Sequence, residues 1–226
     1  MGNEFIKNIK YLCECVLNVI YSDDRDCVLC NEYVRDDKYL CDKCKSKVKL
    51  CKNHFEINEE NFIVKCYSSA YYSDVIKELV IKLKYKSDFK AGEVLVEYML
   101  NTIKSKNIKF DIITFVPSTK EAIKRRGYNQ SKYLAKAVAY KTNTKILEFL
   151  IKDNDTRDQI GLNGEERWTN LKNSFKCINE KYLNNKTILL VDDVVTTGAT
   201  SFYCAKTMLG NGARNVIVLT CAKSSL

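Results

Sequence analysis

An acidic pair followed by a threonine-rich loop is the segment of this sequence best equipped for chemistry. It reads TILLVDDVVTTGATS from Thr187 to Ser201, which is an apolar strand, the pair Asp192 and Asp193, a short loop and a helix. The N–H groups at a helix N-terminus bind phosphate, and glycine lets the backbone approach it. Adjacent carboxylates accept hydrogen bonds from sugar hydroxyls or hold Mg²⁺, directly or through water. We therefore predict a phosphorylated-sugar site whose phosphate loop comprises Thr196, Thr197, Gly198, Ala199 and Thr200.

A second strand end carries polar and basic groups that could complete this site. The segment FVPSTKEAIKRRGYNQ begins at Phe115, and its strand ends at the same sheet edge if the two strands are parallel. Guanidinium groups bind diphosphates well, so we expect Arg125 and Arg126 to contact such a group, together with Ser118 and Thr119. Both segments also have a structural interpretation, as a solvated acidic turn and a solvated basic helix end.

Four of the eleven cysteines have the spacing of a metal site. Cys27 and Cys30 form one CxxC motif, and Cys41 and Cys44 form another. Two such motifs supply the four thiolates of a tetrahedral, structural zinc site. Zinc would also substitute for the core that so small a domain lacks. An iron–sulfur cluster and four unliganded buried cysteines are the alternatives.

The elements that would position these residues alternate between strands and helices. The late strands are apolar throughout, which is typical of a parallel sheet covered by helices on both faces. We therefore expect an α/β fold. Strands are expected at 62–72, 111–116, 145–151, 187–191 and 215–221, helices after Ser73 and at 91–103, 129–140 and 199–209, and a long loop at 152–174.

The composition changes near residue 60, where we place a domain boundary. Residues 1–60 would hold an N-terminal helix and the zinc ribbon, and they carry ten Lys/Arg against twelve Asp/Glu. Residues 61–226 would form the α/β domain, and they carry twenty-seven Lys/Arg against sixteen Asp/Glu. The basic excess therefore belongs to the larger domain. It suits a phosphate-rich ligand or nucleic acid, although a lysine-rich proteome would explain it equally well.

Hydropathy and cysteine usage bear on the compartment. No segment has the run of apolar residues that crosses a bilayer, and the N-terminus shows no signal-peptide pattern. We therefore expect a cytoplasmic protein without membrane insertion. Its cysteines are then reduced thiols or metal ligands, not a disulfide framework.

The segment Thr187–Ser201 closely resembles the signature of type I phosphoribosyltransferases. In that family the acid pair holds the ribose hydroxyls of phosphoribosyl pyrophosphate, and the loop holds its 5′-phosphate. The resemblance implies these roles for Asp192 and Asp193 and for Thr196–Thr200, with Mg²⁺ on the diphosphate. It also implies displacement of pyrophosphate at the anomeric carbon of ribose. The sequence names no nucleophile, so the acceptor stays open.

Further segments are similar to the ComF family, the competence-associated branch of these proteins. They are LKYK from Leu83, VPSTKEAIKRRGYNQSKYLA from Val116 and TRDQIGLNGEERWTNLKNSF from Thr156. With the N-terminal cysteines, the resemblance covers nearly the whole chain. It implies catalytic roles for Gln159 and Arg167 beside the acid pair. The family often has basic residues before the position of Thr156, whereas here only Lys152 is basic, which weakens the expected stabilisation of a leaving pyrophosphate.

The resemblance implies a type I phosphoribosyltransferase-like fold with a small N-terminal zinc ribbon, and it leaves three functions open. The first is a ComF-like protein that binds phosphoribosyl pyrophosphate in DNA uptake, with a competence helicase or another protein on the ribbon. The second is an active phosphoribosyltransferase on a small nitrogenous or nucleotide acceptor. The third is a zinc-ribbon adaptor with a relic site. In the first, single-stranded DNA would follow Lys77, Lys82, Lys84, Tyr85, Lys86, Lys120, Lys124 and Tyr128.

Overall fold

A computed structural model describes residues 26–34, 39–60, 62–152 and 174–224, together with Trp168 and Leu171. Two compact units divide between Ser46 and Lys47, whereas the sequence analysis places the boundary near residue 60. The difference arises because β1 (Phe55–Glu59) pairs with β2 (Phe62–Tyr71) and so belongs to the larger unit. The expected N-terminal helix lies outside the described residues.

The main sheet of the larger unit has five strands in the order β1-β2-β7-β6-β3. Besides β1 and β2, these are β3 (Ile112–Phe115), β6 (Thr187–Val195) and β7 (Asn215–Lys223). Neighbouring strands run parallel except β1 and β2, which are antiparallel. The apolar runs of β6 and β7 are buried along nearly their whole length, as strands covered on both faces should be. The expected parallel sheet is confirmed, and the carboxyl ends of β2, β3, β6 and β7 meet at one edge.

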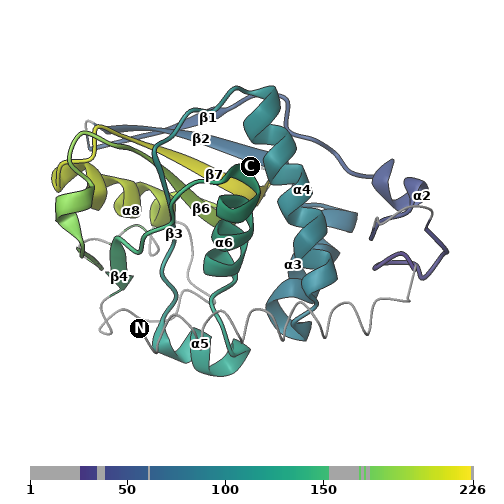
Figure 1. The fold of residues 1–226 in the computed structure, drawn as a ribbon. Helices are drawn as coiled ribbons and strands as arrows, with labels where there is room; N and C mark the ends of the chain where they lie inside the picture. The colour runs from purple at the N-terminus through teal and green to yellow at the C-terminus, as the bar shows by residue number, and fades with distance from the viewer. Residues whose placement is uncertain are drawn as a thin grey trace. The chain divides into compact units, whose positions relative to one another are not determined.

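Helices cover both faces of this sheet (Figure 1). On one face lie α4 (Phe89–Ser105) and α6 (Gln130–Thr142), with α3 (Asp74–Lys86) packed along α4, and on the other lies α8 (Ala199–Gly210). Successive residues of a strand point to opposite faces, so Ile188 and Leu190 join the core around Phe202 of α8. The expected α/β fold is therefore confirmed. Among the described helices, none has both the length and the apolarity that a membrane crossing requires.

The segment after β3 forms a short helix, α5 (Lys120–Arg126), that was not among the expected elements. Thr119 caps it by accepting a hydrogen bond from the backbone N–H of Ala122 at 3.1 Å. Gly127, at φ +82°, ends it in the left-handed conformation that glycine adopts readily. The two arginines thus lie in the last turn of a helix at the carboxyl edge of the sheet.

The expected single strand at 145–151 is interrupted. Ile146 forms an isolated parallel bridge to Ile113, beside the main sheet. Farther along, β4 (Leu150–Lys152) pairs antiparallel with β5 (Phe175–Cys177) in a separate two-stranded sheet. The chain therefore changes its pairing partner within the segment, which the apolar pattern alone does not reveal. A short 3₁₀ helix (Glu180–Tyr182) follows before β6.

Candidate functional site

A cavity of about 370 Å³ opens at the carboxyl ends of β3 and β6. Ligands of open α/β sheets bind at this edge. Ten of the residues predicted to bind the ligand line it: Ser118, Thr119, Arg126, Asp192, Asp193, Thr196, Thr197, Gly198, Ala199 and Thr200. Arg125 does not line the cavity and is exposed on α5. Gln159 and Arg167 lie outside the described residues.

The phosphate loop leads directly into α8. Gly198 is the N-cap of this helix at φ +85°, and its carbonyl accepts a hydrogen bond from the N–H of Phe202 at 2.9 Å. A side chain at this position would be strained, and its Cβ would lie 2.7 Å from Cδ1 of Ile57. Glycine therefore lets the backbone turn sharply, so that the first N–H groups of α8 face the cavity end of the strand.

The acid pair lies inside β6, since this strand continues to Val195. Both side chains are buried, with 9% of Asp192 and 4% of Asp193 exposed. Oδ1 of Asp192 accepts hydrogen bonds from the Ser131 hydroxyl at 2.7 Å and from the Asp193 backbone N–H at 2.9 Å. Burial, and then the neighbouring Asp193 charge, raise the pKa of Asp192 to about 7. The site therefore holds an unusually basic carboxyl group beside a second acid.

Lys84 is a site residue that the sequence analysis assigned elsewhere. It comes from α3, and its Nζ lies 2.8 Å from Oδ2 of Asp193 within the cavity lining. Burial alone would lower the pKa of Lys84, but the Asp193 carboxylate outweighs it and raises that pKa. Because the lysine is engaged with Asp193, its charge is already compensated inside the cavity, whereas the DNA path that includes it stays a prediction. Neither the helical spacing of Lys84 nor the LKYK segment predicts the ion pair with Asp193. That pair depends on how α3 packs.

Arg126 forms the basic wall of the cavity. Its Nη1 donates a hydrogen bond to Oε1 of Gln130 at 3.0 Å, and its guanidinium lies 5.4 Å from the ring centre of Tyr85. Its Nε is buried and has no hydrogen-bond partner among the described residues. A buried donor of this kind is costly to leave unpaired, so the site is prepared to donate to an anion. Among the polar lining residues, sequence reasoning did not assign Tyr72, Lys84, Tyr85, Gln130 and Ser131 to this site.

The four cysteines of the paired CxxC motifs converge in the small unit. Their sulfur atoms all lie within 4.8 Å of one another, and those of Cys30 and Cys41 are 3.5 Å apart. A tetrahedral zinc ion with Zn–S bonds of about 2.3 Å would set sulfurs about 3.8 Å apart. Cys41 also caps α2 (Asp42–Lys45), where its sulfur accepts from the Cys44 N–H at 3.4 Å. The cluster therefore fits a four-thiolate metal site and could hold zinc.

Burial, backbone hydrogen bonds and the neighbouring thiols together shift the pKa values of these thiols. Burial alone would raise the pKa of Cys27, but backbone hydrogen bonds lower this pKa to about 6. Burial and the neighbouring thiols raise the pKa of Cys44. Four thiolates so close together repel one another, and a divalent cation removes that repulsion.

Comparison with known proteins finds relatives along most of the chain. The DNA utilization protein YhgH of Escherichia coli is 28% identical over 204 residues, which cover 85% of this chain and 87% of that protein. Competence protein F of Haemophilus influenzae is 24% identical over 207 residues, covering 88% and 90%. Competence protein ComFC of Bacillus subtilis is 22% identical over 209 residues, covering 79% and 81%.

No protein-family model matches the chain. Among solved structures, an adenine phosphoribosyltransferase of Trypanosoma brucei aligns with a TM-score of 0.41 and 14% identity over 60% of this chain and 54% of that one. That of Thermoanaerobacter pseudethanolicus aligns with a TM-score of 0.41 and 14% identity over 75% and 95%. From its sequence relatives, the chain is a homologue of the ComF competence proteins and of the DNA utilization protein YhgH, which confirms the resemblance in its motifs.

Proposed function

We propose that this chain binds phosphoribosyl pyrophosphate, or a closely related phosphorylated ribose, in the cavity at the carboxyl edge. One observation carries the proposal: a helix N-terminus, two buried acids and an arginine whose Nε is buried converge on a single cavity. These groups match a phosphate, a pair of hydroxyls and a diphosphate, respectively.

Each part of the ligand then has a partner of suitable chemistry. The 5′-phosphate would accept hydrogen bonds from the N–H groups of the loop Thr196–Thr200. The ribose hydroxyls would donate to Asp192 and Asp193. The diphosphate would accept from Nε of Arg126. Because the acid pair lies on β6, Arg126 on α5 and the phosphate loop between β6 and α8, the chain would orient the ligand without much rearrangement.

Mg²⁺ would enter this site with the diphosphate, whose charge it neutralises. Carboxylate oxygens are its usual protein ligands. However, Oδ2 of Asp193 already lies 2.8 Å from the Lys84 ammonium, so a cation bound directly there would meet a like charge. This favours hydroxyl binding by the acid pair and contact with Mg²⁺ through water.

Calorimetry with phosphoribosyl pyrophosphate and Mg²⁺ tests the proposal. The double variant Asp192→Asn with Asp193→Asn should lose binding, because amides cannot replace both anionic acceptors. Glu78→Gln is the matched control, since it removes one exposed acid of α3 away from the cavity. Equal affinity in the double variant and the wild type would exclude the site. Pyrophosphate release in the presence of candidate acceptors would separate an active transferase from a binding protein.

We further propose that the chain acts in DNA uptake and contacts single-stranded DNA. The names of its relatives assign them to competence and DNA utilization, and the basic excess lies in residues 61–226. Several lysines of the expected path are exposed: Lys77, Lys86, Lys120 and Lys124. Such side chains can neutralise phosphates of a flexible strand.

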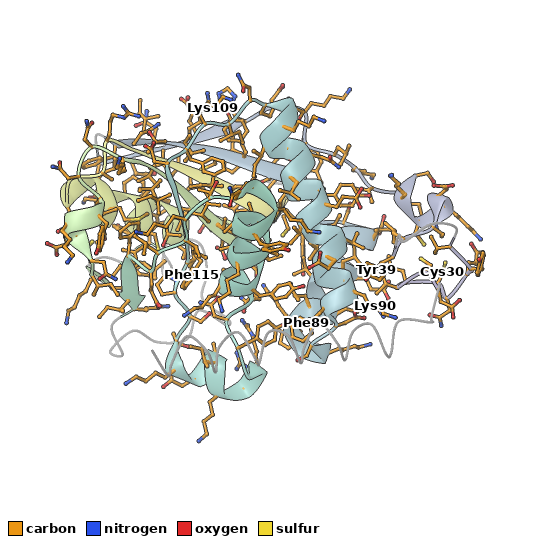
Figure 2. The ribbon with its side chains drawn as sticks, viewed as in Figure 1. Cys30, Tyr39, Phe89, Lys90, Lys109 and Phe115 are labelled. Atoms are coloured by element: carbon orange, nitrogen blue, oxygen red, sulfur yellow. The ribbon has the colours of Figure 1, made fainter. Side chains whose placement is uncertain are left out.

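Fluorescence anisotropy with a labelled oligonucleotide in a salt titration tests the DNA contact. Lys120→Ala with Lys124→Ala on α5 should weaken binding and lower the salt slope by roughly one for each lysine that contacts a phosphate. Lys109→Ala is the control, because Figure 2 shows Lys109 at the top of the view, whereas Figure 1 shows α5 at the bottom of the same view. A wild-type affinity that does not change with salt would rule out a lysine-mediated contact.

A further inference from the structure

Tyr85 presents an aromatic ring at the mouth of the phosphosugar cavity. It is the penultimate residue of α3, it lines the cavity, and 60% of its surface is exposed. Tyr72, which directly follows β2, also lines the cavity, and the charges of Lys84 and Asp193 act on its hydroxyl. An exposed aromatic ring beside a cavity gives a ligand apolar surface to cover, and covering it is favourable.

The backbone that carries Tyr85 is braced from several directions. The Tyr128 hydroxyl donates a hydrogen bond to the carbonyl of Leu83. Phe89, labelled in Figure 2 at the start of α4, packs on Tyr128 with ring centres 5.6 Å apart. Lys82 pairs with the α4 N-cap residue Asp88 at 3.7 Å. The ring is therefore presented at a defined place, not on a loose helix end.

The basic wall of the cavity also supports the ring. The Arg126 guanidinium lies 5.4 Å from the ring centre while Gln130 holds its other end. A guanidinium over one face of an aromatic ring still leaves open surface, as the 60% exposure of Tyr85 indicates. Stacked arginine and tyrosine form a flat, electropositive platform, which suits a flat, electron-rich heterocycle attached to a phosphorylated sugar.

We propose that Tyr85, supported by Arg126, is a stacking platform for a nucleobase whose sugar phosphate occupies the cavity. The inference rests on the proposed binding of phosphorylated ribose and deepens it, because it names the class of group that faces the cavity mouth. The base can belong to a mononucleotide or to single-stranded DNA, since both present the same aromatic face. Stacking is tolerant of base identity, so we expect little difference between purines and pyrimidines beyond ring size.

Calorimetry with ribose 5-phosphate, AMP and UMP tests this platform. The wild type should bind AMP at least about fivefold more tightly than ribose 5-phosphate, which is the lower range for stacking one base. Tyr85→Ala should bring the ratio of the two affinities close to one, and Tyr85→Phe should restore it, because stacking needs the ring and not the hydroxyl. Tyr140→Ala is the control, since Tyr140 is an exposed tyrosine on α6 that does not line the cavity.

The outcomes separate this inference from the function on which it rests. If ribose 5-phosphate binds but AMP binds no more tightly, or if Tyr85→Ala keeps the ratio, the platform is excluded and the sugar site stands. If neither ligand binds while phosphoribosyl pyrophosphate does, the platform is excluded and the sugar site stands. If phosphoribosyl pyrophosphate does not bind either, the sugar site and the platform are both excluded. Titration with a single-stranded oligonucleotide identifies the source of the base. If Tyr85→Ala binds the oligonucleotide more weakly than the wild type, the platform binds DNA bases. If the two bind it equally, the platform binds the bases of mononucleotides.

Discussion

At the scale of the residue, the site is built from charges that compensate one another inside the protein. Asp193 is neutralised by Lys84, and Asp192 is held by the Ser131 hydroxyl and a backbone N–H. Two adjacent buried acids would otherwise repel each other strongly. A sugar whose hydroxyls donate hydrogen bonds to the two acids would compensate their charges further. Ligand binding should therefore stabilise the folded protein.

Asp192 should make the stability of the ligand-free protein depend on pH. Burial raises its pKa from the ordinary 3.8 to about 7, so between these values the folded protein keeps a proton that the unfolded chain releases. Stability should therefore fall as pH rises through this interval, by at most about 1.4 kcal/mol per pH unit, and level off above it. Asp192→Asn should flatten this slope and raise the melting temperature at alkaline pH. Thermal melts over a pH series check this, and an unchanged slope in the variant would contradict it.

Lys84→Met should destabilise the folded protein by about 3 kcal/mol, because it leaves the buried Asp193 carboxylate without its cation. Adding Asp193→Asn should recover most of that loss, since the second change removes the unpaired charge. Urea denaturation of both single variants and the double variant measures the coupling. Lys132→Met is the control: its pair with Glu148, 3.2 Å apart, is more than two-fifths exposed and should contribute less than about 1 kcal/mol. Additive effects of the two site changes would show that the ion pair is not coupled.

At the scale of the element, helix caps and strand ends bring the site together. Asn129 caps α6 by accepting from the Lys132 N–H at 3.1 Å, and its side-chain amide donates to the Val116 carbonyl at the end of β3 at 3.0 Å. One residue thus ties the start of α6 to the segment that leads from β3 into α5, the helix that carries Arg126. On the other side of the cavity, Gly198 sets the angle between β6 and α8.

Gly198→Ala should lower stability by about 1–2 kcal/mol and weaken phosphate binding. The position has a positive φ, and the added Cβ would press on Ile57. Gly210→Ala is the matched control in the same helix, because a Cβ there would have no described atom within 4 Å and alanine favours the helix by up to about 1 kcal/mol. Chemical denaturation and phosphate titration of both variants check the prediction. Equal stability losses at the two glycines would mean that φ and Ile57 do not constrain the loop.

At the scale of the whole molecule, the two units depend on different sources of stability. The larger unit has an extensive buried core on both sides of its sheet. The described part of the small unit buries few apolar side chains besides its cysteines, among them Val34 and Leu40. A metal would therefore contribute most of the folding free energy of the small unit and little of that of the larger one.

The purified protein should contain about one zinc ion per chain, and Cys44→Ser should lose it. In the wild type, removal of zinc by a chelator should unfold the small unit while the cavity of the larger unit persists. Elemental analysis gives the metal content, and hydrogen exchange compares the protection of the two units. Cys177→Ser is the control, because this half-buried thiol belongs to β5, outside the cluster. Zinc retained in Cys44→Ser would contradict a four-thiolate site.

The α/β architecture, the paired cysteines and ten of the twenty-two residues that line the cavity could be predicted from the sequence. These follow from local order, since the apolar run of β6, the acids, the glycine and α8 are consecutive, and consecutive residues cannot lie far apart. Which side chains from other elements complete the site depends on tertiary packing. Lys84 and Tyr85 come from α3, about a hundred residues before the acid pair, and their directions depend on how that helix packs on α4. The different roles of Arg125 and Arg126 were decided in the same way, because neighbouring positions on α5 point in different directions.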